Sequence, residues 1–318
     1  MQILKTIINR TDSVLSNLSL RLLGEKNGLS SFLFHAVHQN NQFSNTLYPQ
    51  ENLTVDALDS FVSKLLNLQY SFIAPNDILK GTLYPNKKYA LLTFDDGYYN
   101  NTWTLEVLEK YQVPAVFFIS TSLIQQHQKN WADIVYHERN KQGISNATIH
   151  REVVALSTQR VSEIRNYITK EFGLKSFIPH GDQDRMMTSN ELREFSKNKF
   201  VHIGNHSHSH AALASLSESD CLDELKTSQR ILHEIIGYTP SFISYPYGSY
   251  NESVMNIAKK ENFRLGITTI QKKDTIPIPS QHLMELKRFN PVFRNDNVNF
   301  DLLRSPIQMK TLLKQVIK

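Results

Sequence analysis

The stretch YALLTFDDGYYNNTWTLEVLEKYQVPAVFFIS, residues 89–120, decides the fold class. Residues 89–94 form an apolar run typical of a buried strand, and residues 104–111 have helical spacing before Pro114 ends the helix. Residues 115–120 form a second apolar run. A strand, a helix and a second strand in this order predict a parallel βαβ unit.

The same alternation continues along the chain. We expect further strands at residues 31–37, 201–205, 241–245 and 265–270, and further helices at residues 56–68, 161–172, 189–196, 219–236 and 252–262. After the strand at 115–120 the pattern is less regular, with a polar stretch at residues 125–130. Repeated units of this kind predict an α/β fold with a parallel sheet, and their number favours a barrel over an open sheet.

The two ends of the chain are expected to be helical extensions of this barrel. Residues 1–28 and 301–318 have amphipathic helical patterns, the second of them basic, and residues 29–300 form the main domain. We expect both ends to pack on the domain, with contact to a membrane surface as the alternative.

Composition excludes several classes of protein. The single cysteine, Cys221, excludes intrachain disulfides and cysteine-based zinc fingers. The net charge of +5 comes without a basic block, so nucleic acid is not an expected partner. No apolar run approaches the roughly 18 residues of a membrane span, and the N-terminus lacks the continuous apolar core of a secretory signal. We therefore expect a cytoplasmic protein, with the amphipathic ends as candidates for contact with the inner face of the membrane.

Three groups of reactive residues fall where predicted strands end, which is where active sites of barrels form. They are the carboxylate pair in TFDDG (93–97), the histidines in HSHSH (206–210) and the turn SYPYG (244–248). Each alone has a plain interpretation: a common acidic turn, a solvated histidine loop and an ordinary proline turn. Their coincidence at strand ends favours a functional site. Histidines four residues apart would face the same way on a helical turn.

These residue types suit metal-assisted hydrolysis. Two neutral imidazoles and one carboxylate bind a zinc-type ion and leave a coordination position for water. A second carboxylate that does not bind the ion is then needed to accept a proton from that water. Neighbouring aspartates at a strand end can supply the two roles.

The motifs resemble those of the polysaccharide deacetylases with the NodB-homology domain, from about Phe32 to Asn290. The resemblance implies a distorted (β/α) barrel with fewer units than the eightfold form. It implies Asp95 as the base and, as metal ligands, Asp96, His206 and His210, with Zn²⁺ the expected ion. SYPYG resembles the Tyr-Pro-Tyr-Gly branch of the family, in which the Tyr247 amide would complete an oxyanion hole.

The chain also departs from the family pattern. Many members carry an arginine where this chain has Ser244, and Arg288 resembles a late arginine that could orient the base instead. The late Leu-x-His that supplies the general acid in many relatives is not visible, and His282 lacks its context. We expect His208 to point away from the ligands. Trp131, Asp133 and His137 lie in a region that could form a lid or a substrate wall, and His35, Tyr245 and Pro246 are expected at the substrate.

The predicted function is metal-dependent removal of N-acetyl groups from an N-acetylated sugar or polysaccharide precursor, with release of acetate. Two alternatives stay open. One is a glycan-binding relative without catalysis, and the other is an O-acetyl esterase or an amidase for non-sugar substrates. The expected partner is therefore an N-acetylated saccharide.

Overall fold

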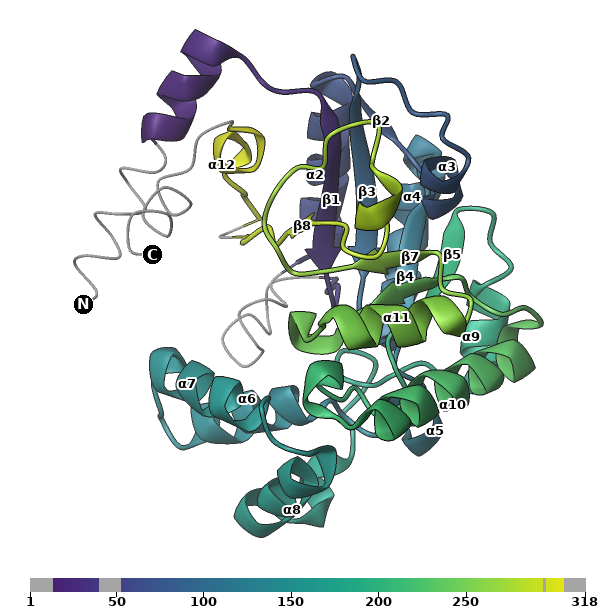
Figure 1. The fold of residues 1–318 in the computed structure, drawn as a ribbon. Coiled ribbons are helices and arrows are strands. Elements are labelled where there is room, and N and C mark those ends of the chain that lie inside the picture. The colour runs from purple at the N-terminus through teal and green to yellow at the C-terminus, as the bar shows by residue number, and fades with distance from the viewer. Residues whose placement is uncertain (1–13, 40–52, 294–295, 306–318) are drawn as a thin grey trace, which may run out of the picture.

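A parallel sheet that curls into a nearly closed barrel forms the centre of the molecule (Figure 1). The computed structural model describes residues 14–39, 53–293 and 296–305. The strands follow the order β7-β6-β5-β4-β3-β1-β8, and β2 pairs with β3 beside this path. All strand pairs are parallel, as the alternation of strands and helices predicts.

The strands are short, as expected for a small barrel: β1 (Gly28–Phe34), β2 (Tyr70–Phe72), β3 (Lys88–Phe94), β4 (Ala115–Ile119), β5 (Val201–Asn205), β6 (Phe242–Ser244), β7 (Leu265–Ile267) and β8 (Arg288–Phe289). The helices are α2 (Val55–Asn67), α3 (Pro75–Leu79), α4 (Leu105–Tyr111), α5 (Thr121–Gln126), α6 (Trp131–Lys141), α7 (Asn146–Leu156), α8 (Val161–Phe172), α9 (Ser189–Phe195), α10 (Glu218–Ile236), α11 (Glu252–Lys260) and α12 (Phe300–Arg304).

The segment around β8 closes the barrel. Arg288 and Phe289 pair with β1, while Leu286, just before them, bridges Ile267 of β7. Backbone bonds between Leu286 and Gly266 and from Thr268 to Leu286 reinforce this contact. The two edges of the sheet are therefore joined by one short segment, which removes most of the exposed strand edge.

Side chains of β3 alternate between the inside and the outside of the barrel. Leu92 and Phe94 belong to the core beneath α2 and α4, whereas Leu91 packs with residues of β1, β4, β6 and β7. Because the side-chain period of a strand is two, Thr93 shares the inner face with Leu91. The next residue in this inner row is Asp95, at the carboxyl end of the strand.

The section after β4 is more helical than the sequence pattern predicts. Residues 121–172 contain α5, α6, α7 and α8, and the last three surround a separate buried cluster that includes Ile134, Ile149 and Ile168. Figure 1 shows these three helices gathered beyond the carboxyl ends of β1 and β3. We call them the helical cap.

Residues 14–23 form a helix at the end of the barrel opposite the helical cap (Figure 1). After it, the buried Glu25 pairs with Lys88 of β3, Lys273 and Arg304 of α12, and so ties both extensions to the barrel. The predicted helical regions 1–13 and 306–318 lie outside the described residues. Within residues 14–39, 53–293 and 296–305, no helix has the length and hydropathy needed to cross a bilayer.

Candidate metal centre and catalytic cleft

The carboxylate pair follows β3 at a sharp turn of the backbone. Asp95 still continues the strand, and its amide bonds to the Phe34 carbonyl of β1. Asp96 (φ 79°) and Gly97 (φ 94°) then adopt left-handed conformations. A side chain at Gly97 would also press on Ile119 and Ile124, at 3.2 Å from each. The turn therefore makes the two neighbouring aspartates face different surroundings.

The two histidines of the second motif lie in a loop after β5, and the expected helical turn is not present. Ser207 (φ 63°) and His210 (φ 58°) are both left-handed, so the backbone reverses within the motif. Glu224 of α10 accepts bonds from the amides of His208 (3.0 Å) and Ser209 (2.8 Å) and from the Ser209 hydroxyl (2.6 Å). Hydrogen bonds from a carboxylate, rather than helical spacing, hold this loop in shape.

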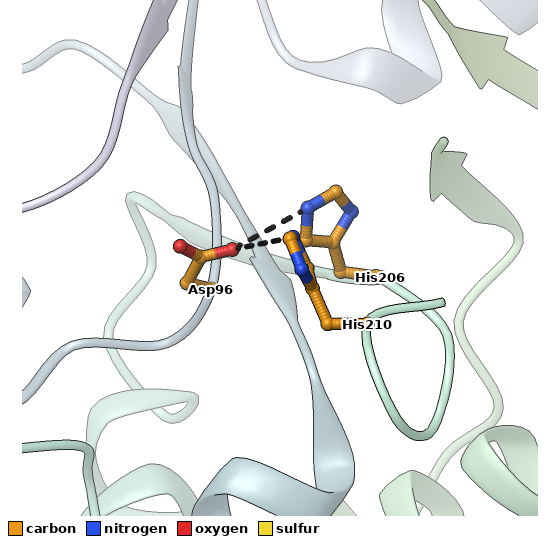
Figure 2. Close-up of side chains that lie close together, drawn as sticks. All are labelled: Asp96, His206 and His210. Carbon is orange, nitrogen blue, oxygen red and sulfur yellow. Dashed lines mark ion pairs between the residues drawn. The ribbon is translucent and has the colours of Figure 1, made fainter. Parts of the chain in front are cut away.

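Asp96, His206 and His210 converge as the sequence predicts (Figure 2). Asp96 Oδ1 lies 3.5 Å from His206 Nε2 and 3.2 Å from His210 Nε2. This oxygen is buried and accepts no hydrogen bond from the described part of the chain. One potential ligand atom from each of the three residues lies within 4.8 Å of the others. The donor set of two imidazoles and one carboxylate fits a catalytic zinc-type ion.

The other ring nitrogen of each histidine also has a partner. His206 Nδ1 lies 2.7 Å from the Ser244 carbonyl oxygen, which can only accept a hydrogen bond, so the ring proton is on Nδ1. The lone pair of Nε2 is therefore available for a metal ion. His210 Nδ1 lies 2.9 Å from the Tyr247 hydroxyl. Burial lowers the pKa of His206 to about 4, although the negative charge of Asp95 acts to raise this pKa. This imidazole is therefore neutral at pH 7, as a metal ligand must be.

Asp95 is held by Arg288 and Ser244 inside the barrel mouth. The Arg288 guanidinium donates to Oδ1 at 2.8 Å and to Oδ2 at 2.9 Å, and the Ser244 hydroxyl donates to Oδ2 at 3.1 Å. Burial alone would raise the pKa of Asp95, but Arg288 and then His206 hold it below its usual value. Asp95 Oδ2 lies 3.7 Å from His206 Nε2, so the ionised carboxylate stands beside the three potential ligands.

These groups line a cleft of about 310 Å³ between the barrel mouth and the helical cap. The lining includes the five residues Asp95, Asp96, His206, His210 and Arg288, and also His35, Tyr245, Tyr247, Trp131 and Asp133.

The remaining predicted residues differ in where they lie. Tyr245 borders the cleft, although its ring is buried and its hydroxyl donates to the Met284 carbonyl. Pro246 is buried and is not one of the lining residues. His208 bonds to Thr121 at 2.9 Å, away from the cleft, and His282 pairs with Glu285 elsewhere.

The sequence pattern missed a support for Asp96 from the cap. Asn130 Nδ2 donates to Asp96 Oδ2 at 2.9 Å, and its Oδ1 accepts from the Ala132 amide as the N-cap of α6. Asn130 followed three residues later by Asp133 is a helix-start pattern, so the signal was present within the polar stretch.

A model of the family described as polysaccharide deacetylase matches residues 83–266, more than half of the chain. The chain belongs to the polysaccharide deacetylase family. A peptidoglycan-N-acetylglucosamine deacetylase of Bacillus cereus is 36% identical over 63 residues, which are 20% of this chain and 23% of that protein. The segments shared with the curated relatives span less than half of the length of those proteins.

Solved structures of deacetylases share the fold. The Streptococcus pyogenes deacetylase PplD, in complex with acetate, aligns over 83% of this chain and 92% of its own, with a TM-score of 0.57 and 18% identity. A de-N-acetylase from Aggregatibacter actinomycetemcomitans aligns over 83% and 94%, with a TM-score of 0.58 and 16% identity. The predicted (β/α) barrel of the polysaccharide deacetylase type is therefore confirmed.

Two of the predicted site residues that line the cleft lie outside the range matched by the family model. His35 follows β1, and Arg288 begins β8, beyond residue 266. Their assignment to the site depends on the geometry of the cleft. Membership of the Tyr-Pro-Tyr-Gly branch stays a prediction.

Proposed function

We propose that this protein is a metal-dependent hydrolase that removes N-acetyl groups from an N-acetylated sugar or polysaccharide and releases acetate. The single observation that carries the proposal is the grouping of Asp96, His206 and His210 beside the separately held Asp95. Membership of the family supports the reaction class, and a cleft of about 310 Å³ is large enough for a sugar ring with its acetamide.

Asp96, His206 and His210 would hold the divalent ion, for which Zn²⁺ is our expectation. When bound, such an ion acts as a Lewis acid toward the acetamide carbonyl and makes water more acidic. The chain supplies one neutral Nε2 atom for this purpose from His206, because burial keeps that imidazole unprotonated. Asn130 fixes the rotamer of Asp96 by donating to its other oxygen, at 2.9 Å.

Asp95 would act as the general base. Its carboxylate is ionised at neutral pH, and Arg288 and Ser244 hold it in one orientation. An oriented carboxylate can accept the proton of a water as that water attacks the carbonyl carbon. We assign the Tyr247 amide to stabilising the developing oxyanion, and His35, Tyr245 and Trp131 to the walls that position the sugar.

The proposal is tested by acetate release from N-acetylglucosamine oligomers. The protein is stripped with a chelator, divided, and assayed with and without added Zn²⁺. We expect acetate only after the ion is restored. O-acetylated sugars and simple acetamides, assayed in parallel, separate the esterase and amidase alternatives. Binding of N-acetylated oligomers without acetate release, at every metal loading, would instead support the non-catalytic relative.

The domain limits at residues 28 and 300, the cytoplasmic location and the contact of the chain ends with a membrane stay predictions. Helix 14–23 exposes Val14, Leu18 and Leu22 on one side. This exposed apolar side supports the prediction of contact with a membrane.

A further inference from the structure

Amide hydrolysis needs a proton donor as well as a base. The amine that leaves an acetamide is a very poor leaving group unless its nitrogen is protonated as the C–N bond breaks. Asp95 accepts a proton from water and is held in place by Arg288, so its carboxylate is not free to move to the leaving nitrogen on the other side of the scissile amide. The cleft must therefore contain a second acid.

Building on the proposed deacetylation, we propose that Asp133 of α6 donates the proton to the departing amine nitrogen. Asp133 lines the same cleft as Asp95, Asp96 and His206. The residue is 6% exposed, which makes it a buried carboxyl group in contact with the site and not a surface charge.

The two carboxyl groups reach the cleft from different walls. Asp95 is fixed from the barrel interior by Arg288 of β8 and Ser244 at the end of β6. Asp133 lies in the first turn of α6 in the helical cap, and its Oδ2 accepts a 2.7 Å bond from the Tyr98 hydroxyl. A base and an acid on separate walls are what a scissile bond lying between them requires.

Asn130 anchors this wall directly to the potential metal ligands. It caps α6 and donates to Asp96 Oδ2, so the first turn of α6 is attached to the site by one residue. Asp133, in the same turn, is thereby kept at a defined position relative to Asp96. Such positioning on a helix is more precise than positioning on a free loop.

The surroundings of Asp133 favour its protonated form. Burial is the largest influence and raises its pKa to about 7, and the carboxylates of Asp96 and Asp184 act in the same direction. The Tyr98 hydroxyl and Lys129 oppose them, and the N-terminus of α6 also favours the anion. His150 of α7 lines the same cleft.

These residues and solvent together account for every proton in the reaction. Water adds its oxygen to the carbonyl carbon and gives one proton to Asp95. The C–N bond then breaks while the Asp133 carboxyl proton moves to the nitrogen, which leaves acetic acid, a free amine and an Asp133 carboxylate. The acetic acid loses its proton to solvent and is released as acetate. The proton held by Asp95 passes to solvent, and Asp133 regains one from solvent before the next turnover.

The test compares two leaving groups in Asp133→Asn. An N-acetylglucosamine oligomer needs a protonated leaving nitrogen, whereas para-nitrophenyl acetate releases a stable phenolate without a proton. We expect acetate release from the oligomer to fall by about 10²-fold or more, and ester hydrolysis to stay within about three-fold of wild type. Asp133→Glu, which keeps an ionisable proton, should recover part of the amide activity.

Bound metal and thermal stability are measured for each variant, and Asp182→Asn serves as a matched control outside the cleft lining. An equal loss on both substrates would overturn the assignment, because it would mean that Asp133 only shapes the site. Unchanged amide activity in Asp133→Asn would overturn it as well. If the wild type cleaves the ester but no N-acetylated sugar, the proposed function fails, and the assignment of Asp133 fails with it.

Discussion

Arg288 donates to both carboxylate oxygens of Asp95, at 2.8 and 2.9 Å, although 193 residues separate the two in sequence. The same guanidinium also donates to the Thr268 carbonyl at 2.9 Å and to the Thr93 hydroxyl at 3.1 Å. Because β8 closes the barrel against β1, the arginine that begins β8 lies inside the mouth, next to the end of β3. Arg288 therefore belongs to the segment that closes the barrel and also orients the base.

Arg288→Lys should lower acetate release by about 10²-fold while leaving the bound metal unchanged. A lysine keeps the positive charge but cannot donate to both oxygens of Asp95 in one plane, so the base loses its fixed orientation. Metal analysis and initial rates are measured on the same preparation. Arg264→Lys, an exchange at an exposed position, is the control and should behave as wild type. Full activity in Arg288→Lys would show that this contact does not orient the base.

Glu224→Ala should weaken metal binding by about ten-fold or more. Removing the carboxylate takes away three hydrogen bonds from the loop that carries His206 and His210, and lost outer contacts of ligands typically cost 10- to 100-fold in affinity. Glu224→Gln keeps an oxygen for the two amides and should retain most of the affinity. Competition with a chromogenic chelator measures both. Equal affinity in Glu224→Ala and wild type would contradict this role of Glu224.

Protonation of His206 should destabilise the metal-free protein on acidification. The pKa of His206 is about 4 when folded and about 6.5 when unfolded, so the unfolded chain binds more protons between these values. The contribution of unprotonated His206 to the free energy of unfolding is complete above about pH 6.5. This contribution falls by up to about 3 kcal/mol as the pH drops to about 4. The raised pKa of Asp133 acts in the opposite direction. Urea unfolding of wild type and His206→Asn across this range isolates His206, and identical pH slopes would refute the prediction.

Gly204→Ala should destabilise the barrel by about 1–3 kcal/mol. A Cβ at this position would lie 2.4 Å from two ring atoms of Phe118 on the neighbouring strand β4, and Phe118 is fully buried. The ring has little room to move, so β5 would shift and carry the loop after it. Denaturant unfolding measures the change. Stability equal to wild type would mean that the ring relaxes without cost.

The barrel was predictable because its strands are apolar runs ending in reactive residues. β5 and α8 have the limits that the pattern indicates. α4 and β3 differ from the predicted limits by one residue at one end, and α2 differs by one residue at each end. The helical cap was less evident because α6 has a mixed surface with many polar residues, and its start depends on the single cap Asn130.

The site was predictable in its residues more than in its geometry. Asp95, Asp96, His206 and His210 each follow a strand, so the parallel sheet brings them to one edge. The loop shape was not predictable, because the left-handed Ser207 and the long-range bonds to Glu224 leave no local pattern. Asp133 was assigned only to a region, since its burial depends on how the cap packs on the barrel.

The most direct measurement is bound metal and acetate release, determined together, for wild type, Asp95→Asn and His206→Ala. Asp95→Asn should keep the metal and lose acetate release by at least about 10²-fold, because only the base is removed. His206→Ala should lose both, because one of the three ligands is gone. Equal metal content and equal acetate release in all three proteins would contradict a metal centre at Asp96, His206 and His210 with Asp95 as its base.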